Sequence, residues 1–223
     1  MIYAPYLTND SKEEIMKERK SKSQTLKTVK LTQLAFLIAV IILMTFTPIG
    51  YIPIGPLKIT LLLLPVVLGA ILLGPSGGTI CGLAFGLSSF ITCFTGDAFG
   101  GALVSINPFY TFITCVVTRT VMGYLTGLLF KKIKKDEKTL PLILTSATGV
   151  CLNTFLFMGA IILFFRNAPV VTGWMKSLGA NNLFTFLILA VGVNFLVELL
   201  VTVILSVAIS KAMFKAFNNQ KTN

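Results

Sequence analysis

Two charged side chains interrupt otherwise apolar helical runs, and they are the first candidates for chemistry in this sequence. Arg119 and Glu198 each lie near the middle of a helix-length apolar segment. A charge at that depth in a membrane is costly, so it usually faces a cavity or an opposite charge. The residues leave two interpretations open: direct contact with a polar ligand, or a structural Arg119–Glu198 ion pair that holds two helices together.

Three uncharged polar side chains accompany these charges. Asn153 and Thr154 are adjacent in the middle of one apolar run, and Asn194 lies one helical turn before Glu198, on the same face. An amide both donates and accepts hydrogen bonds, so it suits a ligand with hydroxyl or amide groups. The alternative is that these side chains only form hydrogen bonds between helices.

A second set of candidates falls in segments that we expect on the outer face. Trp174 is the single tryptophan, and it is either an anchor at the membrane surface or part of a lid over a ligand. Lys58, Arg166 and Lys176 are isolated cations there. They could attract an anionic ligand or be ordinary exposed loop charges.

The residue types argue against catalysis on this chain. The sequence has no histidine, and it lacks the GxxxxGK[ST], HExxH and GxSxG patterns that mark nucleotide, zinc and serine-hydrolase sites. Its four cysteines lie in apolar segments without a CxxC pair, so we expect buried structural thiols. We therefore expect no enzyme, no metal and no cofactor.

The elements that carry these residues are membrane helices. Hydrophobic residues make up 55% of the chain and charged residues only 12%, against about 25% charged in soluble domains. Residues 31–57, 59–96 and 140–165 contain no charge at all, and runs of about 20 such residues span a bilayer. The fold class we expect is an all-α bundle of six transmembrane helices over residues 30–47, 59–74, 78–95, 108–130, 139–165 and 183–213.

The basic residues give the orientation. Of 19 Lys and Arg residues, seven lie in residues 1–30, five in residues 131–138 and three after Ser210. These flanks are cytoplasmic by the positive-inside rule, which places both termini inside. Residues 1–29 and 214–223 are then cytoplasmic tails, and the net charge requires no nucleic-acid partner.

Small residues predict where helices pack closely. Gly78, Gly82 and Gly86 are four residues apart, so they line one face after the break at GPSGG, and another backbone can approach there. We expect a tight helical hairpin entered through the loop PIGYIPIGP. Ala35 and Ala39 form a similar pair in the first helix, for packing within the chain or for contact with a partner.

The stretch from Pro48 to Phe90, followed by INPFYTFITCVVTRTVMGYLTGLLF, resembles the substrate-binding (S) components of energy-coupling factor (ECF) vitamin transporters. The mid-helix Asn153–Thr154 pair and the Asn194-x-x-x-Glu198 spacing agree with that family. The resemblance covers residues 30–213, which would form the substrate-binding domain in a bacterial cell membrane. It does not extend to the N-terminal tail.

The resemblance implies a partner set and a mechanism. S components capture a vitamin from outside and then topple in the membrane, powered by ATP hydrolysis on two cytosolic ATPases joined through a transmembrane coupling protein. The family docks that protein with an AxxxA pattern on helix 1, which Ala35 and Ala39 match. An autonomous secondary transporter and a membrane enzyme or structural protein remain alternatives.

Within the family, the chain is most similar to the pantothenate-type group. The matching stretches are Gly55-Pro56-Leu-Lys-Ile-Thr60 and Leu73-Gly74-Pro75-Ser-Gly-Gly78. Related members often carry a histidine near Leu63-Leu64, where this chain has none, so pyridoxamine, folate or a cobamide precursor also fit the resemblance. The expected ligand-binding residues are Lys58, Arg119, Asn153, Thr154, Trp174, Asn194 and Glu198.

Overall fold

The computed structural model describes residues 9–54, 57–134 and 139–222. Within these, the side chains of some residues are not described, among them Lys58 and Asn194. The chain separates into two units, residues 1–36 and residues 37–223. The first unit holds the N-terminal part of helix α1 (Asn9–Thr45), and the second holds every other element.

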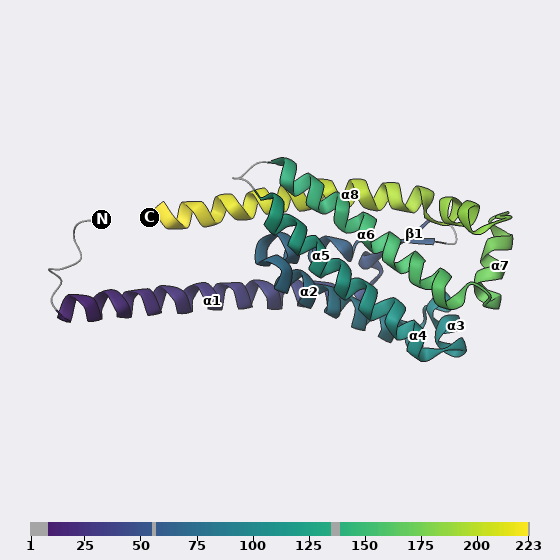
Figure 1. Ribbon diagram of the computed structural model, residues 1–223, viewed down its shortest axis with the longest axis horizontal. Helices are drawn as coiled ribbons and strands as arrows, with labels where there is room; N and C mark the ends of the chain where they lie inside the picture. The colour runs from purple at the N-terminus through teal and green to yellow at the C-terminus, as the bar shows by residue number, and fades with distance from the viewer. Residues whose placement is uncertain (1–8, 55–56, 135–138, 223) are drawn as a thin grey trace. The chain divides into compact units, whose positions relative to one another are not determined.

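Helices dominate the second unit (Figure 1). After α1 come a 3-10 turn η1 (Pro48–Gly50), strands β1 (Tyr51–Ile54) and β2 (Leu57–Thr60), and helix α2 (Leu63–Thr95). The remaining elements are α3 (Ala98–Ile106), α4 (Pro108–Phe112), the π-helical turn η2 (Ile113–Val117), α5 (Thr118–Ile133), α6 (Thr139–Phe165), α7 (Pro169–Ser177) and α8 (Leu183–Thr222).

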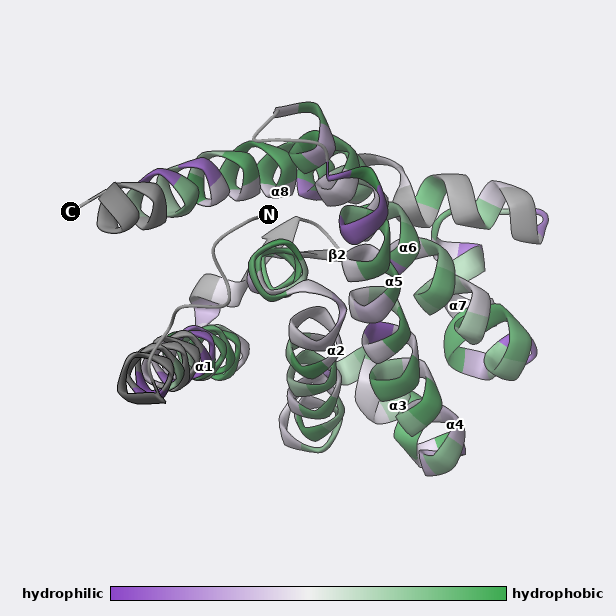
Figure 2. Cartoon of the chain, turned by 60° about the vertical axis from the view of Figure 1, so that its left-hand side comes forward, coloured by the Kyte–Doolittle hydropathy of each residue, from purple (hydrophilic) through white to green (hydrophobic). Residues whose placement is uncertain are grey.

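Five helical segments in the described residues are long and apolar enough to cross a membrane. Large apolar side chains stay exposed on these helices, for example Phe155 at 76% and Ile204 at 64%, as is typical of surfaces that face lipid tails. Hydrophobic colouring covers much of α2 to α8 (Figure 2). The five segments are Lys27–Thr45, Leu63–Thr95, Pro108–Ile133, Thr139–Phe165 and Phe195–Ala216.

The expected helices at residues 59–74 and 78–95 form one element, α2, with a break inside it. Gly74 has φ 75° and ψ −160°, which is outside the helical region. A methyl group on Gly69 would lie 2.7 Å from the Cys81 Sγ, although twelve residues of continuous helix would separate them by about 18 Å. The two limbs of α2 therefore fold back on each other, which confirms the close hairpin.

The glycine face of the second limb packs closely on another backbone, as the sequence predicts, and that backbone is α5 with the preceding turn η2. A methyl group on Gly78 would lie 2.2 Å from the carbonyl oxygen of Gly123, and one on Gly82 would lie 2.4 Å from that of Arg119. Gly86 is similarly close to the Cys115 carbonyl, at 2.8 Å. The two backbones touch because these positions carry no side chain, and this contact fixes where α5 presents Arg119.

The expected helix start at residue 59 is wrong. Residues 57–60 form β2, which pairs antiparallel with β1 in the register Tyr51 to Thr60 and Ile54 to Leu57, and α2 begins only at Leu63. The β-branched Ile59 and Thr60 favour an extended backbone. The first limb of α2 is consequently short, covering residues 63–73.

Candidate functional site

Arg119 lies buried between two aromatic rings. Its guanidinium carbon is 4.5 Å from the ring centroid of Phe85 in α2 and 4.8 Å from that of Phe157 in α6. Rings on either side stabilise a cation through their negative faces. The aromatic side chains therefore hold the positive charge of α5 at the junction of three helices.

A π-helical turn supplies the carbonyl oxygens that accept hydrogen bonds from Arg119. The Arg119 Nη1 donates to the carbonyl oxygen of Cys115 at 3.0 Å and, more weakly, to that of Thr114 at 3.5 Å. Both carbonyls belong to η2, where the wider turn disturbs the regular helical bonding and is frequently found at functional sites. Among the described residues, the buried Nε has no hydrogen-bond partner.

Asn153 faces the same region from α6. It lies one turn before Phe157, so the two share a helix face, and Phe157 contacts Arg119. The Asn153 Oδ1 is buried and, within the described part of the chain, accepts no hydrogen bond. Buried polar atoms are almost always paired, so a bare acceptor here is ready for a ligand donor. Thr154 is the next residue and is half-buried.

Glu198 anchors the strand hairpin. The backbone N–H of Thr60, at the end of β2, donates to the Glu198 Oε1 at 2.8 Å, and the carboxylate is buried. The Thr60 Oγ1 is also buried and lacks a hydrogen-bond partner among the residues described. Through this hydrogen bond, Glu198 holds Thr60 so that its hydroxyl oxygen, like the Asn153 Oδ1, is buried without a described partner.

Asn153 and Glu198 lie at a similar level between α6 and α8. These helices run in opposite directions (Figure 1), and the Oγ atoms of Ser146 and Ser206 are 2.6 Å apart across them. Asn153 is seven residues after Ser146, and Glu198 is eight residues before Ser206. At 1.5 Å per residue they lie about 10 and 12 Å along their helices from the serine pair, so the two residues are at a similar level of the interior.

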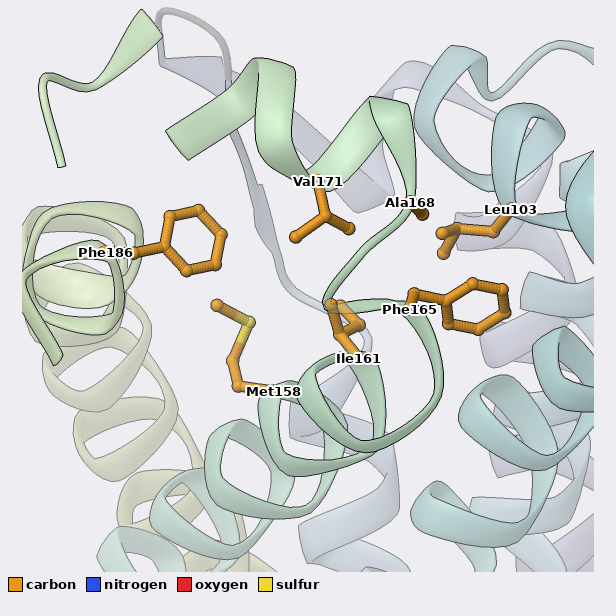
Figure 3. Close-up of a cluster of buried hydrophobic side chains, with 7 residues drawn as sticks. All are labelled: Leu103, Met158, Ile161, Phe165, Ala168, Val171 and Phe186. Carbon is orange, nitrogen blue, oxygen red and sulfur yellow. The ribbon is translucent and has the colours of Figure 1, made fainter. Parts of the chain in front are cut away.

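An aromatic and aliphatic cluster closes one end of this region. Figure 3 shows side chains from α3, α6, α7 and α8 that point toward one another. Trp174 packs beside the cluster, with its ring 5.0 Å from that of Phe99 and 5.1 Å from that of Phe186. The buried members are Leu103, Met158, Ile161, Phe165, Ala168, Val171 and Phe186.

The remaining expected residues are placed less completely. Lys58 is in β2 opposite Pro53, and Asn194 is in α8, but neither side chain is described. Ala35 and Ala39 are both exposed on α1. In the part of the chain that the structure describes, Arg119 and Glu198 form no ion pair with each other. Instead, Arg119 donates to carbonyl oxygens of η2, and Glu198 accepts from a backbone N–H of β2.

Three residues of the candidate site were not predicted from the sequence, namely Thr60, Phe85 and Phe157. The two phenylalanines read as ordinary apolar core positions, since nothing in their spacing indicates a cation between them. Thr60 belongs to the Gly55-to-Thr60 stretch, but its backbone contact joins positions 138 residues apart. Only the folded arrangement reveals that contact.

Comparisons with known proteins give a consistent result. A family model described as "ECF transporter, substrate-specific component" matches residues 29–210. The pantothenate transporter PanT of Leuconostoc mesenteroides is 28% identical over 196 residues, which cover 84% of this chain and 93% of that protein. The pantothenic acid transporter PanT of Lactococcus lactis subsp. cremoris is 33% identical over 176 residues, which cover 74% and 82%.

Proposed function

We propose that this chain, which belongs to the family of substrate-specific components of ECF transporters, captures pantothenate from outside the bacterial cell. The family consists of multi-pass membrane transporter components and is not a family of enzymes. Two relatives are named for pantothenate transport. The observation that carries the proposal is the group of unpaired buried polar atoms on Arg119, Asn153 and Thr60.

The chemistry of pantothenate matches these atoms. The vitamin carries a carboxylate, an amide and hydroxyl groups. Arg119 supplies a donor and a positive charge for the carboxylate, and Asn153 accepts from a hydroxyl or amide N–H. The Thr60 hydroxyl can donate or accept, and Glu198 holds Thr60 in place. Lys58, Thr154, Trp174 and Asn194 complete the proposed binding residues.

A membrane topology with six crossings and both termini cytoplasmic remains part of the proposal. The first limb of α2, residues 63–73, is about 16 Å long, which is half of a bilayer core. The four residues of β2 add about 13 Å. Strand and half-helix together therefore reach about 30 Å, and extended backbone is tolerated at that depth when protein surrounds it.

Transport then requires partners that hydrolyse ATP. This sequence carries no phosphate-binding loop, so we assign ATP hydrolysis to two cytosolic ATPases joined through a transmembrane coupling protein. Ala35 and Ala39 form the proposed docking face, because small exposed residues four apart let another helix approach. Toppling of the loaded subunit would release the vitamin inside.

Ligand identification tests the proposal directly. The full chain is purified in detergent, denatured, and the released small molecules are identified by mass spectrometry. We expect stoichiometric pantothenate, and calorimetry with emptied protein should give high affinity for pantothenate and none for pyridoxamine or folate. Release of another vitamin would overturn the assignment of pantothenate as the ligand. An empty site that binds no vitamin would overturn the proposal that the chain captures a vitamin.

A pair of arginine variants checks the site. Arg119→Lys keeps the charge but removes the planar donor set, so pantothenate affinity should fall at least about tenfold. Arg166 is exposed, and Arg166→Lys is the matched control that should bind as the unmodified chain does. Equal affinity of the Arg119 variant would remove Arg119 from the site.

A further inference from the structure

Two cysteines that are 22 residues apart in the sequence lie side by side in the folded chain. The Sγ atoms of Cys93, near the end of α2, and Cys115, in η2, are 4.0 Å apart. Both side chains are buried. The other two cysteines lie elsewhere, because Cys81 packs against Gly69 in the other limb of α2 and Cys151 is exposed on α6.

Surrounding contacts hold the two thiols together. Val116, Phe90 and Val104 pack around the pair, and the Cys93 thiol donates to the carbonyl oxygen of Ser89 at 3.3 Å. On its other side, a methyl group on Gly100 would lie 2.5 Å from the Cys93 Sγ. The thiol of Cys93 is thus confined between Cys115 and the backbone of α3.

Both cysteines lie where the helical backbone is irregular. A disulfide needs the sulfurs at about 2.05 Å, so they must approach each other by about 2 Å. Cys93 lies two residues before the end of α2, where Gly96 takes φ 144° and terminates the helix. Cys115 lies in a π-helical turn, which departs from the regular helical hydrogen bonding.

We propose that Cys93 and Cys115 are a redox modification site that closes to a reversible disulfide under a two-electron thiol oxidant such as a diazenedicarboxamide. One thiolate attacks a nitrogen of the N=N bond and forms an S–N bond. The second thiolate then attacks that sulfur, so the S–S bond forms while the S–N bond breaks. Both electrons and both thiol protons end on the nitrogens, which become the hydrazine.

The bond would have a defined structural effect. It closes a loop over residues 93–115 that contains α3 and α4, and Leu103 of α3 packs into the cluster at the end of the bundle. Arg119 donates to the carbonyl oxygen of Cys115 itself. Oxidation therefore ties the end of α2 to the turn that orients Arg119.

Thiol counting tests the site without any ligand. The full chain is incubated with diazenedicarboxamide, denatured, alkylated with N-ethylmaleimide and weighed intact. We expect the four cysteines of the chain to lose two maleimide labels, with peptide mapping placing the link between Cys93 and Cys115, and a phosphine to restore both labels. Retention of all four labels, or a link to another cysteine, would overturn the proposal.

Variants separate this pair from the other thiols. The double variant Cys81→Ala, Cys151→Ser retains the pair and should lose both of its labels on oxidation. Cys115→Ser in the same background should keep its one label.

The oxidised double variant should unfold at a temperature several degrees higher than the reduced one, because the cross-link restricts the unfolded chain. A lower unfolding temperature would mean that the link forms only by distortion, which would overturn a site built into the fold.

Discussion

The Glu198 carboxylate accepts a hydrogen bond from the backbone N–H of Thr60 at 2.8 Å, and it thereby joins α8 to β2 across 138 residues of sequence. This bond makes Glu198 a positioning residue for the strand hairpin. It leaves the Thr60 hydroxyl buried and unpaired within the described residues. The bond therefore links the placement of the hairpin to the proposed site.

Removing this acceptor should weaken ligand binding. Hydrogen bonds to charged groups contribute about 1.5–3 kcal/mol, so Glu198→Ala should lower pantothenate affinity by about tenfold or more in calorimetry. Glu198→Gln keeps an oxygen at the acceptor position and should bind within about threefold of the unmodified chain. Glu13→Ala is the control on an exposed glutamate. Equal losses in the Gln and Ala variants would assign the effect to charge instead of the hydrogen bond.

Asn153 should affect binding without supporting the empty fold. Its Oδ1 is buried without a described partner, and an unpaired acceptor costs stability. Asn153→Leu should therefore leave the thermal unfolding temperature of the empty protein unchanged or higher, while pantothenate affinity falls at least about tenfold.

Ser206 gives the opposite pattern and serves as the comparison. Its Oγ contacts that of Ser146 at 2.6 Å, so Ser206→Ala should lower stability by about 1 kcal/mol and leave affinity intact. A loss of stability in the Asn153 variant would show that this amide is structural.

The glycine face of α2 should tolerate no added methyl group. Gly78→Ala would place a carbon 2.2 Å from the Gly123 carbonyl oxygen, and overpacking of this kind costs about 1–3 kcal/mol. Gly159→Ala is the control, because nothing lies within 4 Å of its methyl position. Thermal unfolding in detergent compares the two, and similar unfolding temperatures would contradict the close contact of α2 with α5.

Bulky side chains on α1 should separate capture from transport. Ala35→Trp together with Ala39→Trp should abolish pantothenate uptake by cells that express the coupling protein and ATPases, while the purified variant binds pantothenate normally. Ala208 is exposed on α8, and Ala208→Trp should leave uptake intact. Loss of folding in the double variant would place the alanines in internal packing instead of a docking face.

The sequence predicted the elements whose signal is local. Apolar runs without charge identified the helix at residues 139–165 with the bounds of α6, and the four-residue glycine spacing identified the packed face of α2. The helix at residues 183–213 starts correctly but continues to Thr222. Charge-free length and small-residue spacing are properties of the segment itself, which is why they can be read without a structure.

Long-range features could not be predicted in the same way. The π-helical turn before Arg119 packs against Gly86 of α2, and no residue pattern in ITCVV marks it. The ion pair considered between Arg119 and Glu198 is not formed among the residues described. Arg119 donates to the Cys115 carbonyl oxygen one turn before it, whereas Glu198 accepts from the backbone N–H of Thr60 in β2. Both outcomes depend on tertiary contacts.

The short first limb of α2 also constrains how the protein is made. Residues 65–71 are all buried in the folded chain, and a helix of about 16 Å cannot cross a hydrocarbon core alone. The insertion machinery would therefore meet a segment that lipid cannot accommodate by itself. We therefore expect this limb to settle only after α5 and α6, which pack on it through Gly123 and Gly149, have entered the membrane, so that the strand hairpin meets α8 late in biogenesis.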